Sequence, residues 1–147
     1  MANIKDSMRK ISKIILHCTA TPEGRDISVD DIRQWHLDRG WSDIGYHFVI
    51  DIKGCLQEGR PLTRAGAHVR GHNKGSIGIA YVGGVDENLK PKDTRTEDQK
   101  GRLKALILDL MDAYPCATLH GHNEFSNKAC PSFDVQKEYE DIIDFFK

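Results

Sequence analysis

The sequence lacks the features that define several large classes of protein. No apolar run approaches the roughly 20 residues that a membrane-spanning helix requires. The segment from Met1 to Lys13 is charged and is not followed by the apolar core of a secretion signal. With 21 basic against 22 acidic side chains and a formal net charge of -1, the chain has no excess of positive charge for binding phosphate backbones. We therefore expect a soluble protein that is cytoplasmic as synthesised and has neither a membrane nor a nucleic-acid partner.

The chain also lacks internal repeats and low-complexity tracts, and it has few cysteines. Its 147 residues, of which 39% are hydrophobic, are enough to bury a core without disulfides. We therefore predict a monomer with one domain over residues 1–147, and cysteines that stay reduced. Cys18, Cys55 and Cys116 lie within or beside apolar runs and are expected to be buried free thiols. Only Cys130 lies in polar surroundings that suggest a chemical role.

Hydrophobic periodicity alternates between strand and helix along the chain. Two helix starts are marked by capping signals, at Ser28 and at Thr96. The expected helices cover 28–39, 96–114 and 135–146, and the expected strands cover 11–19, 46–51, 55–58, 76–82 and 117–121. Segment 83–96 is expected to be a mobile surface loop. This alternation predicts an α/β fold with a central mixed β-sheet flanked by α-helices.

A short segment near the C-terminus gathers the side chains best suited to chemistry. It contains His120, His122, Lys128 and Cys130. Cysteine thiolate and neutral imidazole are the ligands that zinc prefers, so the segment indicates a transition-metal site. In a strand, His120 and His122 would share a face, and either could be the ligand. His17 lies in an apolar strand, where a histidine is ordinarily a core residue, so the residues alone leave the ligand set open.

Several motifs follow one another along the chain. They are His17-Cys18-Thr19-Ala20-Thr21-Pro22, the segments 41–50, 67–73 and 76–79, Gly121-His122, and Lys128-Ala129-Cys130-Pro131. With these motifs the chain resembles the type 2 N-acetylmuramoyl-L-alanine amidases, particularly the compact bacteriophage lysozyme-type amidases, and more distantly the peptidoglycan-recognition proteins. The resemblance extends from about Ile11 to the C-terminal helix. It implies hydrolysis of the amide between N-acetylmuramic acid and the L-alanine that begins the peptidoglycan stem peptide.

The resemblance further implies a zinc ion, Zn²⁺, held by His17, His122 and Cys130. Three protein ligands leave the fourth tetrahedral position for water, which is the arrangement of a catalytic zinc. The same resemblance assigns catalytic roles to Tyr46 and Lys128. A phenol is neutral at pH 7 and would orient water or substrate by hydrogen bonding. A lysine ammonium would stabilise the developing oxyanion.

Substrate contacts are less closely specified. The resemblance places His68 in a motif that borders the substrate groove, so we expect it to bind peptidoglycan or a muropeptide. Arg64 is a further candidate, with Arg70 and Lys74, because cations could meet the carboxylates of the stem peptide. The remaining histidines are expected to be structural: His36, His47, His72 and His120.

The chain departs from many members of the family at Ser132, where they have glycine, so we expect a different backbone path beside the metal. Two alternative functions stay open. One is a non-catalytic peptidoglycan-recognition module, against which the retained Cys130 and Tyr46 argue, and the other is an amidase that also binds a phage RNA polymerase. A zinc nucleobase deaminase fits the sequence poorly because the His-x-Glu and Pro-Cys-x-x-Cys motifs are absent. A phage or prophage endolysin acting on the cell wall after lysis and a cytoplasmic recycling enzyme both fit the sequence.

Overall fold

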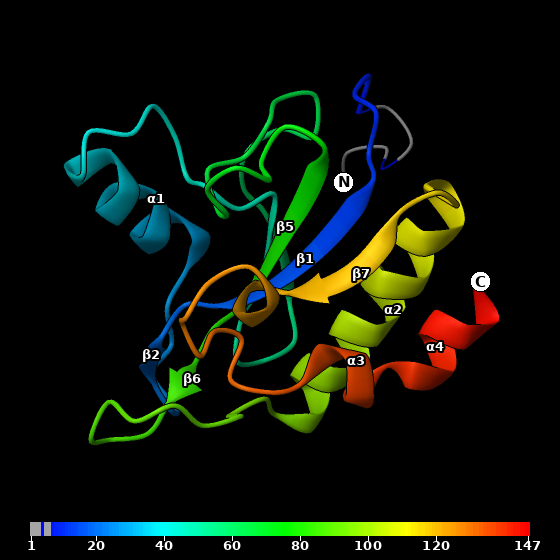
Figure 1. Ribbon diagram of the computed structural model, residues 1–147. Helices are drawn as coiled ribbons and strands as arrows, with labels where there is room; N and C mark the ends of the chain where they lie inside the picture. Colours follow the sequence, from blue (N-terminus) through cyan, green and yellow to red (C-terminus); the bar gives the residue numbers. More distant parts are fainter. Residues whose placement is uncertain (1–3, 5–6) are drawn as a thin grey trace.

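The computed structural model describes residue 4 and residues 7–147, and its centre is a five-stranded sheet. In spatial order the strands are β4 (Leu56–Glu58), β3 (Phe48–Ile50), β5 (Ser76–Tyr81), β1 (Lys13–Cys18) and β7 (Thr118–Gly121). Figure 1 shows β5, β1 and β7 side by side. Strand β4 is antiparallel to β3, whereas the neighbours β3 and β5, β5 and β1, and β1 and β7 are parallel. The mixed sheet expected from the sequence is therefore confirmed.

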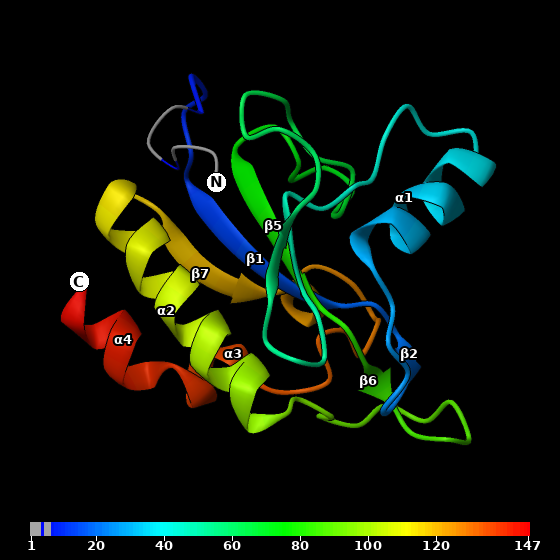
Figure 2. The same ribbon diagram turned by 180° about the vertical axis from the view of Figure 1, so that it is seen from behind.

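Helices lie on both faces of this sheet (Figure 2). Helix α2 (Glu97–Ala113) packs on one face with α3 (Val135–Glu138) and α4 (Glu140–Phe145), and α1 (Val29–Asp38) packs on the other. Alternation along β3 explains the division, because Phe48 and Ile50 join the cluster that contains Ile107 of α2, while Val49 joins Ile32 of α1. The parallel strands are thus covered on both sides, as their apolar character requires.

Both predicted capping boxes are present. The Ser28 hydroxyl accepts a hydrogen bond from the Asp31 N–H at 3.1 Å, and the Thr96 hydroxyl accepts one from the Gln99 N–H at 3.0 Å. Each cap satisfies a backbone donor at a helix start and contributes about 1 kcal/mol. The predicted C-terminal helix is instead two helices, because Tyr139 leaves helical geometry with φ of -113° and ψ of 25°.

Two of the three predicted core thiols are in fact exposed. Cys18 is buried at 4% exposure, but Cys55 and Cys116 are both at the surface. Cys55 follows the turn of the β3–β4 hairpin, where its N–H donates to Asp51 Oδ1 at 2.9 Å. Cys116 lies in the turn after α2, beside Pro115. The apolar runs around these cysteines end in turns, so the prediction of burial was wrong for both.

The segment expected to be a surface loop at 83–96 is partly strand. It begins with β6 (Gly84–Val85), which pairs in parallel with β2 (Thr21–Pro22). The Gly84 N–H donates to Thr94 Oγ1 at 2.8 Å, so the two ends of the segment are joined. The expectation is therefore wrong for the first residues of the segment. Among the described residues, no helix has both the length and the apolar character needed to cross a membrane.

Candidate metal centre

The sheet brings His17 and His122 together at the edge where its parallel strands end. His17 lies near the end of β1 and alternates with Leu16, so its side chain points away from the face that α2 covers. Leu16 pairs with Gly121 of β7, and the next residue, His122, begins a short 3-10 helix, η1 (His122–Glu124). The imidazole centroids of His17 and His122 are consequently 4.7 Å apart. The carboxyl edge of parallel strands is a common place for ligand sites.

The loop that carries Cys130 is fixed to the ends of neighbouring strands. The Tyr81 hydroxyl donates to the Pro131 carbonyl at 2.6 Å, and the Ser132 hydroxyl donates to the Gly84 carbonyl at 2.7 Å. The Cys18 N–H in turn donates to Cys130 Sγ at 3.2 Å. Ser132 has φ of 73°, in the left-handed region, so this serine adopts a backbone conformation that favours glycine.

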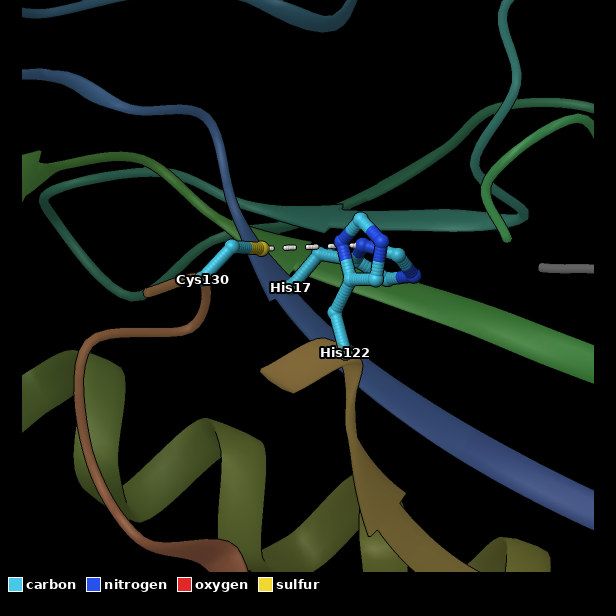
Figure 3. A group of neighbouring side chains, drawn as sticks. All are labelled: His17, His122 and Cys130. Carbon is cyan, nitrogen blue, oxygen red and sulfur yellow. Dashed lines mark hydrogen bonds between the residues drawn. The ribbon is translucent and has the colours of Figure 1, made fainter. Parts of the chain in front are cut away.

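Three side chains form the candidate metal centre, and Figure 3 shows them converging from β1, η1 and the loop at Cys130. One potential ligand atom from each of His17, His122 and Cys130 lies within 4.8 Å of the other two. His17 Nδ1 and Cys130 Sγ are 3.7 Å apart. His122 Nδ1 is buried and has no hydrogen-bond partner among the described residues. Such a nitrogen costs about 1–3 kcal/mol unless it is satisfied, and a metal ion would satisfy it.

The electrostatics of the site favour neutral imidazoles. Burial lowers the pKa of His17 well below its ordinary value, and the neighbouring imidazoles and the Lys128 ammonium lower it further. Burial and Lys128 also lower the pKa of His122. The contact with the Cys18 thiol and burial raise the pKa of Cys130, so its thiolate needs a nearby cation. A coordinated metal ion deprotonates a thiol outright and binds neutral imidazole, so the donor set fits a metal such as zinc.

Both predicted catalytic residues lie in the cleft beside this cluster. The cleft has a volume of about 230 Å³, and its walls include Tyr46 and Lys128 together with His17. The Tyr46 ring centroid is 5.2 Å from that of His17. Burial and then the adjacent thiols raise the pKa of Tyr46 above its ordinary value, so the phenol stays a hydrogen-bond donor. Lys128 is exposed and presents its charge at the cleft.

The predicted substrate residues divide into two groups. His68 lines the cleft, but its Nδ1 is 2.8 Å from His17 Nε2 and its Nε2 is 3.1 Å from the Ser76 hydroxyl, so both ring nitrogens are engaged. Arg64 is not part of the cleft wall, and its guanidinium lies 3.3 Å from the Ser42 hydroxyl. The weaker candidates Arg70 and Lys74 are also absent from the wall. Of the predicted substrate residues, His68 therefore lies beside the candidate metal centre, whereas the three cations lie outside the cleft wall.

The other histidines have partners that fit structural roles. His120, considered above as an alternative metal ligand, bonds Glu124 at 2.8 Å through Nδ1 and the Thr118 hydroxyl at 2.6 Å through Nε2. His36 Nδ1 accepts from the Gly45 N–H at 2.9 Å. His47 Nδ1 accepts from the Gly78 N–H at 3.1 Å.

Among the cleft residues to which the sequence reasoning gave no role are Arg39 and Trp41. Both follow α1 and line the same cleft as the metal cluster. The guanidinium carbon of Arg39 lies 5.8 Å from the Trp41 ring centroid, and the Trp41 ring is 4.4 Å from that of His36. Trp41 opens one of the motifs noted above, whereas Arg39 had no signal apart from its place at the end of a helix.

Comparison with known proteins agrees with this geometry. The family model described as N-acetylmuramoyl-L-alanine amidase (Amidase_2) matches residues 7–133. The endolysin of Enterobacteria phage K11 is 39% identical over 138 residues, which are 93% of this chain and 91% of that protein. The solved N-acetylmuramoyl-L-alanine amidase LysC from Clostridium intestinale URNW has a TM-score of 0.79 at 29% identity, covering 95% of this chain and 89% of that chain. A variant of Drosophila PGRP-LB in complex with tracheal cytotoxin has a TM-score of 0.74 at 25% identity, covering 90% and 81% of the two chains.

The mixed sheet and the cluster at its carboxyl edge define an α/β protein with a candidate metal site in an open cleft. Within that class, the chain belongs to the N-acetylmuramoyl-L-alanine amidase family and is a hydrolase with phage endolysins among its relatives.

Proposed function

We propose that this amidase is a zinc enzyme in which His17, His122 and Cys130 hold the ion. The proposed reaction is hydrolysis of the amide between N-acetylmuramic acid and L-alanine in peptidoglycan. The observation that carries the proposal is the meeting of these three side chains, with His122 Nδ1 buried and unpartnered among the described residues. Two neutral imidazoles and one thiolate would leave a divalent ion with a net charge of about +1 and one position for water.

When bound, zinc would supply a Lewis acid and a water whose pKa is lowered toward about 7. Side chains of the cleft would orient the reactants and stabilise the developing negative charge. Tyr46 stays protonated because it is buried, so it can orient the water or the substrate carbonyl by donating a hydrogen bond. Lys128 brings an ammonium group to the cleft, where the oxygen of the attacked carbonyl becomes negative. One such donor is worth about 3–4 kcal/mol in other hydrolases.

The walls of the cleft suit an anionic, partly apolar substrate. Arg39 and Lys128 supply positive charge, and Trp41 supplies an aromatic surface. The stem peptide of peptidoglycan carries carboxylates, which arginine and lysine can bind by charge-assisted hydrogen bonds. A variant of PGRP-LB, a solved relative, is in complex with tracheal cytotoxin, which supports a ligand-binding role for this chain. We therefore assign peptidoglycan or its fragments as the substrate.

Removing either proposed catalytic side chain should uncouple turnover from metal binding. Tyr46→Phe and Lys128→Ala are each expected to retain one zinc per chain and to lose about 100-fold or more in kcat, because each removes a group that acts on the transition state. Zinc content by elemental analysis and initial rates on purified cell wall measure the two effects. Arg64→Ala is the matched control for loss of a cation, since Arg64 lies outside the cleft wall. Loss of zinc from Tyr46→Phe or Lys128→Ala would show that these residues support the metal instead.

The activity itself is tested by the new amino termini that the enzyme releases from purified sacculi. Cleavage at the proposed bond exposes the amino group of L-alanine, whereas cleavage within the stem peptide exposes other residues. We expect L-alanine termini that appear with zinc and disappear after chelation. Binding to sacculi without any release would instead identify a recognition module. A parallel assay on soluble muropeptides distinguishes an endolysin, which should favour intact wall, from a recycling enzyme.

A further inference from the structure

We infer that His68 is a positioning residue that holds the proposed metal ligand His17 in one tautomer and one ring orientation. The structure thereby reassigns His68 from direct substrate binding to support of the metal centre. The inference rests on the zinc site of the proposed function. It is tested by measurements on the metal site that need no substrate.

The hydrogen bonds around His17 define the direction of this support. His17 Nδ1 faces Cys130 Sγ at 3.7 Å, and His17 Nε2 faces His68 Nδ1 at 2.8 Å. A nitrogen that binds metal must offer its lone pair, so the proton of a neutral His17 belongs on Nε2. His68 Nδ1 then accepts that proton's hydrogen bond. The proton of His68 consequently lies on its own Nε2, which donates to the Ser76 hydroxyl at 3.1 Å.

All three members of this chain of hydrogen bonds are removed from solvent. His17 is 2% exposed, His68 is 9% exposed and Ser76 is fully buried. Water therefore does not readily replace a lost hydrogen-bond partner. Each hydrogen bond also fixes which nitrogen of the next ring carries the proton. Because both nitrogens of His68 are already bonded within the protein, neither is left for a substrate.

Two glycines form a slot for the His68 ring. A Cβ atom at Gly78 would lie 2.6 Å from His68 Cγ, and one at Gly66 would lie 2.7 Å from His68 Cδ2. Gly78 is in the middle of β5, where glycine ordinarily weakens a strand unless another group approaches closely. Here the group that approaches is the imidazole, which stands edge-on to His17 with an interplanar angle of 86°. Glycine at this position in a central strand thus leaves the space that the His68 ring occupies.

The chemical reason for the arrangement lies in the charge of the site. Histidines that bind metals usually donate their second N–H to a carboxylate, a carbonyl or water, and this bond fixes the tautomer and raises ligand basicity. An imidazole acceptor performs the first task without adding negative charge. The centre then keeps the net charge of about +1 set by one thiolate, which preserves its strength as a Lewis acid.

The test compares two substitutions of His68 that differ in hydrogen bonding. His68→Leu fills much of the slot but accepts no hydrogen bond, whereas His68→Asn keeps an oxygen acceptor near the position of Nδ1. We expect zinc affinity, measured by competition with a chelator, to fall about 10–100-fold in His68→Leu. His68→Asn should recover most of the loss, and Ser76→Ala should show a smaller loss of the same kind. His72→Leu, with its ring against Phe125 and outside the cleft wall, is the matched control and should bind zinc like the unaltered protein.

A second measurement needs no variant to fold. Imidazole ¹⁵N chemical shifts of the unaltered, metal-free protein should show His17 protonated at Nε2 and His68 protonated at Nε2. Protonation of His17 at Nδ1 would overturn the inference. Unchanged zinc affinity in His68→Leu together with a raised KM would also overturn it and restore the substrate-binding role. Failure of the proposed function is distinct, because it would appear as normal zinc binding without release of L-alanine termini.

Discussion

Replacement of Cys130 by alanine is expected to abolish both stoichiometric zinc binding and amidase activity. Cys130 is the one proposed ligand that would be anionic when it binds zinc, and its sulfur lies 3.7 Å from His17 Nδ1. Without it, two imidazoles that burial keeps neutral would have to hold a divalent ion alone. The metal is worth several kcal/mol of transition-state stabilisation, so the rate should fall by about a thousandfold or more. Elemental analysis and a wall-clearing assay measure the two losses.

The exposed cysteines offer matched controls for this substitution. Cys55→Ala and Cys116→Ala each remove a free thiol that is at the surface and outside the cleft wall. Both variants should bind zinc and clear cell wall like the unaltered protein. A metal-free Cys130→Ala protein with full activity would contradict the zinc mechanism.

Mild acid is expected to destabilise the metal-free protein. Burial lowers the pKa of His47 to about 4, and also lowers that of His36 to about 4 and that of His68 to about 3. In the unfolded chain a histidine has a pKa of about 6.5. As pH falls below about 6.5, these histidines take up protons in the unfolded chain, but their buried rings stay neutral in the folded protein until about pH 4. The folded state therefore loses stability, relative to the unfolded chain, between about pH 6.5 and pH 4. For His47, which is 1% exposed, the loss between pH 7 and pH 5 is roughly 2 kcal/mol.

Acidification also lowers the folding stability through His36 and His68. These losses matter because typical domains have a total stability of only about 5–15 kcal/mol. Urea unfolding at pH 7 and pH 5, with zinc removed by a chelator, measures the effect. His47→Gln should lower stability at pH 7 because it disturbs the bond from the Gly78 N–H, but it should reduce the difference between the two pH values by about 2 kcal/mol. An unaltered pH difference in His47→Gln would show that the buried ring is not its source.

The sheet and its helices were predictable because their signals are local. The capping residues Ser28 and Thr96 and the apolar period of α2 specify their helices without tertiary information. Two of the failures occur where a local signal misleads. Apolar runs adjoin Cys55 and Cys116, but Cys55 follows a turn and Cys116 lies within one, and both thiols are exposed. The break at Tyr139 falls inside a continuous apolar pattern and has no signal in the sequence.

The candidate site was predictable in its membership but not in its organisation. Periodicity places His17 in a buried strand, and only a resemblance to known amidases connects it with His122 and Cys130. The register of β1 against β7, with Leu16 opposite Gly121, brings His17 and His122 together, and the Cys18 N–H holds Cys130 Sγ beside them. The partners of His68 are equally non-local, since the bonds to His17 and Ser76 depend on three separate segments. Sequence therefore indicated that His68 lies near the site and could not show which of its neighbours it contacts.

The central claim is that His17, His122 and Cys130 coordinate one zinc ion. Zinc-edge X-ray absorption on the zinc-loaded protein tests it most directly, because the scattering shells distinguish sulfur from nitrogen. The account predicts one sulfur at about 2.3 Å and two imidazole nitrogens at about 2.0–2.1 Å, with the sulfur shell lost in Cys130→Ala. A spectrum without sulfur in the unaltered protein, or with the sulfur shell retained in Cys130→Ala, would contradict it.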